Sequence, residues 1–263
     1  YAMTVMPIYV AIPLMIVLTV LLGFTVAFYI GALLAPDLNE IFSGFVRILT
    51  KPAVLTKDYF FLELGSISGS CLNAGIIGTI CCAMMFLPGM VATGTTVAAF
   101  FLTAGFCFWG ITVLNIWFCF AGVLIGCLIR KVKFYTQGNV FLFSTGIAPL
   151  MTDLLIRYPG AESRGVTLFG AVLTLLVCTV IGLILPAGLA HSPRVHKGYD
   201  LYSAAVPVGL TAFFLRAVLY RVLGGTLPDG VGVGAGDGNW AVCNIFCIAV
   251  FVLALVLGLG LGG

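Results

Sequence analysis

The longest uncharged stretch of the chain covers residues 64–129 and reads LGSISGSCLNAGIIGTICCAMMFLPGMVATGTTVAAFFLTAGFCFWGITVLNIWFCFAGVLIGCLI. It contains no Lys, Arg, Asp or Glu. The hydrocarbon core of a bilayer is about 30 Å thick and takes about 20 helical residues to cross. The stretch is therefore long enough for two or three crossings without one formal charge, and it predicts helices inside a membrane.

The rest of the 263-residue chain has the same character. Residues 1–36, 165–193 and 238–263 are also uncharged, and the whole chain is 62% hydrophobic and 8% charged, with a mean hydropathy of +1.21. Soluble domains are nearer 45–50% apolar and about 25% charged. This composition excludes a soluble enzyme, a nucleic-acid-binding protein and a disordered chain.

The charge balance says little about partners. Twelve Lys and Arg residues against nine Asp and Glu residues give a net charge of +3, and no basic run is long enough to bind nucleic acid. We expect the lipid bilayer to surround the protein, and the composition is compatible with a homo-oligomer. The chain begins at Tyr1 with no basic segment ahead of its first apolar run, so we expect no signal peptide and interpret the sequence as part of a longer protein.

The apolar runs predict helices, because every backbone polar group in lipid must be bonded within the chain and the alternation typical of a barrel is absent. We therefore expect an all-α polytopic integral membrane helix bundle with seven or eight transmembrane helices and a broken or re-entrant segment. The clearest crossings are 7–34, 69–87, 91–110, 112–129, 166–190, 201–220 and 241–261.

Three regions depart from simple crossings. Apolar residues recur at helical spacing in 38–49, which predicts an amphipathic helix on the membrane surface. Residues 105–115 hold Gly105, Gly110 and Asn115, so they predict either a turn between two full crossings or a pair of shorter, broken helices. The apolar part of 138–151 is short, which fits a re-entrant segment or a tilted crossing completed by its flanks, and 153–164 is expected to be a polar loop.

We treat residues 1–263 as a single membrane domain. Two charged, tyrosine-containing segments, Lys57-Asp58-Tyr59 and Lys197-Gly198-Tyr199, each precede a helix rich in small residues. This pattern suggests a weak internal duplication of about 55–130 and 140–263, an arrangement that many transporters have.

Metal and cofactor chemistry has no support in the sequence. The nine cysteines lie inside apolar stretches with no CxxC pair and no nearby histidine, so we interpret them as small packing residues. The alternating glycines of 230–238 lack the GxGxxG pattern of a nucleotide loop. We predict no metal and no cofactor. The spacing of His191, His196 and Asp200 would suit proton exchange, although a solvated loop at the membrane edge explains it more simply.

The informative residues are polar but uncharged side chains deep in apolar runs, including Asn73, Asn115, Ser144 and Thr145. An unpaired amide in lipid costs several kcal/mol, so each must face another helix or a wet cavity. For a single residue, bonding between helices is the simpler interpretation. Together, and without a charge among them, they favour a path for a small neutral or weakly polar solute.

Five short blocks resemble, in the same order, those of a bacterial membrane family catalogued only as domain of unknown function 1576. They are LTKDYFF at 55–61, LNAG at 72–75, GFCFWG at 105–110, LFSTGIAP at 142–149 and HKGYDLY at 196–202. The resemblance covers about residues 55–220. It implies a multi-pass protein of a bacterial inner membrane, with no established activity.

The chain also departs from that family. Ile111 stands where the family usually has Lys, Asp200 stands for Asn, and Ser203 and Ala204 stand for a pair of Asn residues. If those family residues line a path, this member handles a different solute or none.

The leading hypothesis is a channel or facilitative transporter for a small uncharged or weakly polar solute. The residues predicted to line or gate its path are Asp58, Tyr59, Asn73, Asn115, Ser144, Thr145, Asp200 and Tyr202. The alternatives are a membrane-embedded enzyme acting on a lipid or prenyl chain, with His191, His196 and Asp200 as its polar centre, and a non-catalytic subunit of a larger complex. The permeation hypothesis requires that the buried amides and hydroxyls meet a solute rather than one another.

Overall fold

The protein is described by a computed structural model, which defines residues 8–50, 66–86, 93–160, 162, 164–195, 197, 205–227 and 240–261. Within these residues the chain is helical and contains no strand. The all-α class predicted from the apolar runs is confirmed.

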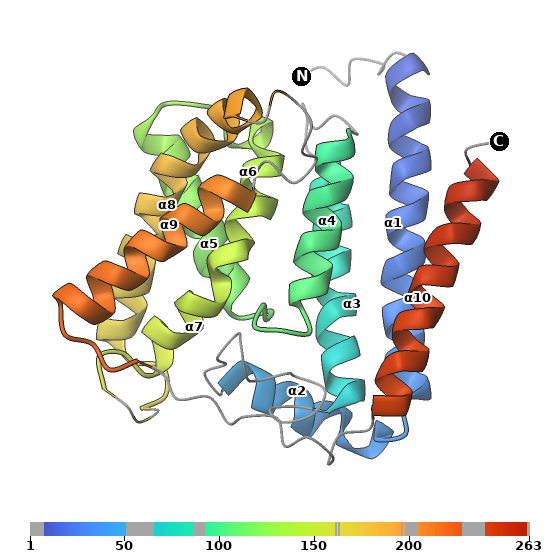
Figure 1. The fold of residues 1–263 in the computed structure, drawn as a ribbon, viewed down its shortest axis with the longest axis horizontal. Helices are drawn as coiled ribbons and strands as arrows, with labels where there is room; N and C mark the ends of the chain where they lie inside the picture. Colours follow the sequence, from blue (N-terminus) through green and yellow to red (C-terminus); the bar gives the residue numbers. More distant parts are fainter. Residues whose placement is uncertain are drawn as a thin grey trace.

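The long helices stand side by side and the chain alternates between two ends of the bundle (Figure 1). The described helices are α1 (Ile8–Leu34), α2 (Ile41–Thr50), α3 (Ile67–Met84), α4 (Gly94–Phe106), α5 (Asn115–Ile129), α6 (Gly138–Ser144), α7 (Ala148–Ile156), α8 (Leu168–Val195), α9 (Ala205–Ala217) and α10 (Trp240–Leu261). A 3-10 turn, η4 (Thr145–Ile147), joins α6 to α7, and a π-helical turn, η5 (Val218–Val222), continues α9.

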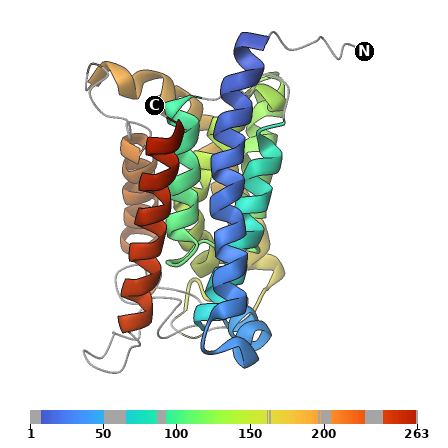
Figure 2. The ribbon, with the colours of Figure 1, turned by 90° about the vertical axis from the view of Figure 1, so that its right-hand side faces the viewer.

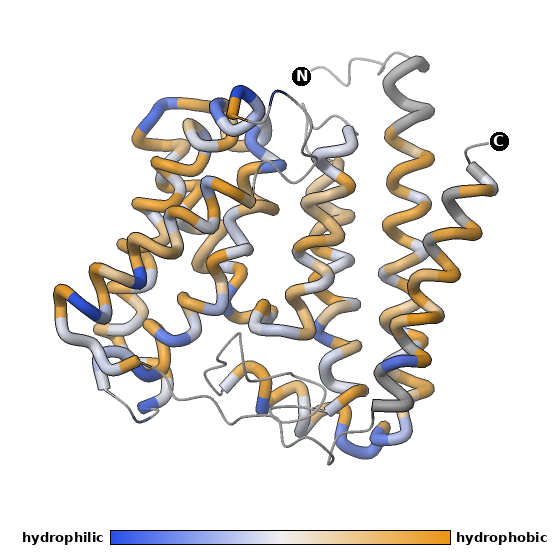
Figure 3. Tube along the Cα trace, in the orientation of Figure 1, coloured by the Kyte–Doolittle hydropathy of each residue, from blue (hydrophilic) through white to orange (hydrophobic). Residues whose placement is uncertain are grey.

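Five described segments are long and apolar enough to cross a membrane, which makes this a multi-pass membrane protein. They are Leu14–Leu34, Ile67–Met84, Gly138–Ile156, Leu168–Val195 and Ala205–Val222. Most of the hydrophilic colour lies near the two ends of the bundle and hydrophobic colour fills the space between them (Figure 3). Helices α1 and α10 lie next to each other at one side, nearest the viewer in Figure 2.

Helix α2 lies across the lower end of the bundle in Figure 1, as predicted for an amphipathic surface helix. It packs on the start of α3, where a Cβ on Gly69 would lie 2.6 Å from the backbone nitrogen of Phe45. The carboxylate of Asp37 accepts hydrogen bonds from the backbone N–H groups of Ile67 and Ser68, at 2.6 and 3.0 Å. These contacts fix the first turn of α3, because the first N–H groups of a helix have no partner within it.

Helices α4 and α5 form a hairpin of two short apolar helices. Both are too short to be full spans, and the turn between them, residues 107–114, ends above α2 in Figure 1. Of the two interpretations of 105–115, the pair of shorter helices is therefore confirmed. The connection from α5 to α6 lies at the upper end of the bundle (Figure 1).

The segment of α6, η4 and α7 crosses the bundle but is broken in its middle. Helix α6 begins at the upper end, η4 interrupts the helix at Thr145–Ile147, and α7 continues towards the lower end (Figure 1). For residues 138–151 the 19-residue candidate span Gly138–Ile156 favours the crossing completed by its flanks over a re-entrant segment. The predicted polar loop at 153–164 is wrong in its first part, because Asp153 belongs to α7 and is buried.

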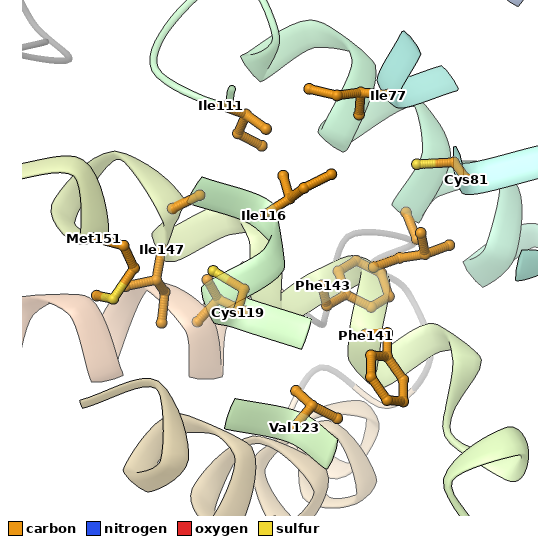
Figure 4. Close-up of a cluster of buried hydrophobic side chains, with 14 of the residues drawn as sticks. Ile77, Cys81, Ile111, Ile116, Cys119, Val123, Phe141, Phe143, Ile147 and Met151 are labelled. Atoms are coloured by element: carbon orange, nitrogen blue, oxygen red, sulfur yellow. The ribbon is translucent and has the colours of Figure 1, made fainter. Parts of the chain in front are cut away.

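The core lies around α5, which contacts α6, α7 and α8. Its side chains are apolar and include Ile111, Ile116, Cys119, Val123 and Met151 (Figure 4). The small residues Gly122 and Gly126 of α5 pack against α8, where a Cβ on Gly126 would lie 2.8 Å from the carbonyl carbon of Gly182. Seven cysteines are buried, in agreement with a packing role, and Cys247 is exposed.

Candidate functional site

Asn73 on α3 holds the turn between α4 and α5. Its Nδ2 donates to the carbonyl oxygens of Cys107 and Ile111 at 2.9 and 2.8 Å, and its Oδ1 accepts from the backbone N–H of Val113 at 3.1 Å. The residue is fully buried. All three bonds go to irregular backbone that has no helical partner of its own.

Asn115, the first residue of α5, holds the same turn from its other side. Its Oδ1 accepts from the backbone N–H of Thr112 at 2.9 Å, and its Nδ2 donates to the carbonyl oxygen of Gly110 at 2.8 Å. The same Nδ2 also donates to the hydroxyl of Thr152 on α7 at 2.7 Å. Asn115 therefore joins the turn to the lower half of the broken crossing.

The turn needs both side chains because unpaired backbone is costly at membrane depth and occurs only where protein or a water-filled cavity satisfies it. Gly110 adds a steric requirement. Its φ is +116°, and a Cβ there would lie 2.7 Å from Cγ of Pro149. Both N–H groups of each amide predicted to line a solute path are thus bonded within the chain, and the two side chains brace this turn.

Thr145, in contrast, borders a cavity. It lies in η4 and lines a cavity of about 180 Å³ between α4, the break in the α6–α7 crossing and the first residues of α9. The lining residues are Leu102, Thr103, Phe106, Ile111, Leu142, Phe143, Thr145, Gly146, Ala205, Val208 and Gly209. Ser144, its neighbour, is not among them and donates to the carbonyl oxygen of Phe141 at 2.6 Å.

The polar part of this cavity is a pair of hydroxyls. Thr145 Oγ1 donates to the carbonyl oxygen of Leu142 at 2.7 Å, Thr103 Oγ1 donates to that of Ala99 at 2.9 Å, and the two hydroxyl oxygens lie 3.1 Å apart. A hydroxyl has one proton and two lone pairs. Because both protons already have acceptors within the chain, the pair keeps lone pairs that can accept hydrogen bonds from a guest.

A buried ionic cluster lies at the lower end of the same crossing. The guanidinium of Arg157 donates to both carboxylate oxygens of Asp153, from Nε at 2.5 Å and from Nη2 at 3.0 Å, and the hydroxyl of Tyr220 in η5 donates to Oδ2 of the same carboxylate. Asp153 and Arg157 are 4% and 3% exposed. Arg157 also donates to the carbonyl oxygens of Gly160 and Thr226. The cluster thereby joins α7 to η5.

Sequence reasoning missed this cluster, although one signal was present. Asp153 and Arg157 are four residues apart, the spacing at which opposite charges meet on one face of a helix. Tyr220 could not have been found in this way, since it lies 67 residues from Asp153.

The other predicted groups are placed as follows. Asp58, Tyr59, Asp200 and Tyr202 lie outside the described residues, as does His196. His191 is exposed near the C-terminal end of α8. No group of three or more His, Cys, Asp or Glu side chains that could hold a metal ion occurs among the residues that the structure describes.

Comparison with protein families decides the identity of the chain at family level. The model of the family described as Protein of unknown function (DUF1576) matches residues 37–221, which is more than half of the chain. The chain belongs to the DUF1576 family. No curated protein matches it. No solved structure matches it either.

The DUF1576 match begins at Asp37, which caps α3, and ends at Arg221 within η5. It therefore contains the braced turn, the cavity at the helix break and the buried ionic cluster. Helices α1 and α10, which lie next to each other in Figure 2, are both outside it. The DUF1576 region thus holds every feature of the candidate site described above.

Proposed function

We propose that this DUF1576 protein is a channel or facilitative transporter for a small, uncharged or weakly polar solute, and that the solute passes the cavity at the break in the α6–α7 crossing. The observation that carries the proposal is the hydroxyl pair of Thr103 and Thr145 beside that break. Broken helices near the middle of a membrane are where transporters place their substrate sites. The break divides a 19-residue candidate span into α6 and α7.

The cavity's chemistry selects the solute class. Its lining contains no charged side chain, and an ion would lose its hydration there without compensation. The lone pairs of the hydroxyl pair favour a solute that donates a hydrogen bond, such as water, an alcohol or an amide. A volume of about 180 Å³ accommodates a few water molecules or one small organic molecule.

The proposed path differs from the one expected from the sequence. The amides of Asn73 and Asn115 are bonded to backbone groups, and among the predicted residues that the structure describes Thr145 is the one that lines this cavity. Ala205, Val208 and Gly209 of α9 close the cavity on the side opposite α4. A displacement of the first turns of α9 would therefore open it.

The test is solute flux in proteoliposomes, measured by stopped-flow light scattering with water, glycerol and urea. The cavity is filled with Gly209→Leu, since a Cβ at Gly209 meets no atom within 4 Å and the variant should fold. Gly105→Leu is the matched control, because Gly105 has equally open surroundings on α4 and does not line the cavity.

We expect the unmodified chain to conduct at least one of these solutes faster than protein-free liposomes, and Gly209→Leu to reduce that rate at least tenfold while Gly105→Leu leaves it unchanged. Thr145→Val should also slow the flux, whereas Thr179→Val, which removes a similar hydroxyl bonded to the carbonyl oxygen of Leu175 on α8, should not. Absence of flux for every solute, or equal flux in both leucine variants, would refute the proposal.

A further inference from the structure

An apolar groove opens on the side of the bundle between α3 and α5. Its walls include Met84 near the C-terminal end of α3 and Trp117 and Phe120 on α5, and Phe141 of α6 lies between them. Phe120 and Phe141 meet edge to face, with ring centroids 5.6 Å apart. The groove has a volume of about 700 Å³, within the range of about 300–1,000 Å³ that ligand sites occupy.

The groove runs from the membrane interior to the upper end of the bundle. Trp117, 53% exposed, lies in the first turn of α5, and Phe134, which follows the end of α5, lines the other end of the groove. At 1.5 Å per residue, α5 rises about 10 Å from Trp117 to Leu124, the α5 residues that line the groove. One leaflet of the hydrocarbon core is about 15 Å thick, so the groove can hold much of one acyl chain along its leaflet.

Three cations stand where a lipid headgroup would lie. Arg130, Lys131 and Lys133 are exposed and occupy the connection immediately before Phe134. Figure 3 shows this connection as a hydrophilic segment at the upper end of the bundle. Within the described part of the chain, none of the three forms an ion pair with a carboxylate. Their charge is therefore available to an external anion.

We propose that this groove is a binding site for an anionic phospholipid, with one acyl chain between α3 and α5 and the phosphate at Arg130, Lys131 and Lys133. Bulk lipid covers any apolar surface, but a groove that ends at three cations without a carboxylate partner among the described residues selects the charge of the headgroup. Basic residues at the membrane surface attract anionic lipids in this way. The site is distinct from the cavity at the helix break, with which it shares no lining residue.

The experiment is native mass spectrometry of the purified full chain, released from nanodiscs that contain equal amounts of phosphatidylglycerol and phosphatidylcholine with identical acyl chains. The measured quantity is the ratio of the two lipids that remain bound. Lys131→Asn with Lys133→Gln removes two charges, and Asn suits the positive φ of 56° at position 131. Arg221→Gln, an exposed cation on η5, is the matched control.

We expect the unmodified chain and Arg221→Gln to retain phosphatidylglycerol preferentially, and the preference to fall about fivefold for each lysine removed. Ala83→Phe and Ala121→Phe each place a ring in the groove from opposite walls and should reduce bound phosphatidylglycerol several-fold. If one of these two variants fails to fold, the other still tests whether the groove holds the acyl chain.

Three results would overturn the proposal. The first is equal retention of both lipids by the unmodified chain. The second is a preference that survives the double lysine variant. The third is displacement of phosphatidylglycerol by glycerol phosphate alone at equal concentration, because the acyl chain and the groove would then contribute nothing.

Discussion

Nδ2 of Asn73 donates a 2.8 Å hydrogen bond to the carbonyl oxygen of Ile111, which lies 38 residues further along the chain. This bond ties α3 to the turn between α4 and α5. The buried amide of Asn73 is therefore no evidence for a solute path. Its Nδ2 donates only to irregular backbone and has no N–H left for a solute.

The first prediction concerns this brace. Asn73→Leu should destabilise the protein by at least about 3 kcal/mol, because three hydrogen bonds are lost and each buried group left unpaired costs about 1–3 kcal/mol. Asn39→Leu, on an exposed 3-10 turn, should change stability by less than about 0.5 kcal/mol. Thermal unfolding in detergent, followed by tryptophan fluorescence, measures both. An unchanged melting temperature for Asn73→Leu would show that the turn does not depend on this side chain.

Much of the fold was predictable because it follows from local pattern. Long apolar runs gave the membrane helices, the spacing of apolar residues in 38–49 gave α2, and the glycines around Gly110 gave the break between α4 and α5. The position of that turn in the bundle was not predictable. It depends on Asn73, which reaches the turn only once α3 is packed beside it.

The candidate site was predictable only in part. Thr145 was selected as a polar residue in an apolar run, and it does border the cavity at the helix break. Its partner Thr103 lies 42 residues away, and the α9 residues that close the cavity follow later still, so no short-range pattern connects them. The internal duplication of 55–130 and 140–263 remains a prediction.

A second prediction tests the link between the hairpin and the broken crossing. Asn115→Ala and Thr152→Val each remove one partner of a 2.7 Å hydrogen bond, so a double-mutant cycle should give a coupling energy of about 0.5–1.5 kcal/mol. Asn115→Ala combined with Thr179→Val should be additive within about 0.5 kcal/mol, since Thr179 bonds within α8. A cycle with no coupling between Asn115 and Thr152 would contradict this link.

A third prediction concerns the seam between α5 and α8. A Cβ on Gly122 would collide with the backbone of Cys178, which cannot move without shifting α8, whereas a Cβ on Gly105 meets nothing within 4 Å. Gly122→Ala should therefore lower stability by about 1–3 kcal/mol. Gly105→Ala should be neutral or stabilising by up to about 1 kcal/mol, because alanine favours a helix over glycine. Comparison of the two melting temperatures checks this, and equal values would mean that the helices are not packed backbone to backbone at Gly122.

The last prediction compares a buried ion pair with an exposed one. Arg157→Met leaves the 4%-exposed carboxylate of Asp153 without its charge partner, and it should destabilise the protein by about 3–5 kcal/mol. Arg47→Met breaks the exposed pair with Glu40 and should cost less than about 1 kcal/mol. Adding Asp153→Asn to Arg157→Met removes the stranded charge, so the double variant should be more stable than Arg157→Met alone. Thermal unfolding of the four proteins in one detergent measures these differences. A further fall in the melting temperature when Asp153→Asn is added to Arg157→Met would contradict this prediction. It would mean that the carboxylate of Asp153 is not left unpaired by the loss of Arg157, and that charge pairing does not hold α7 to η5.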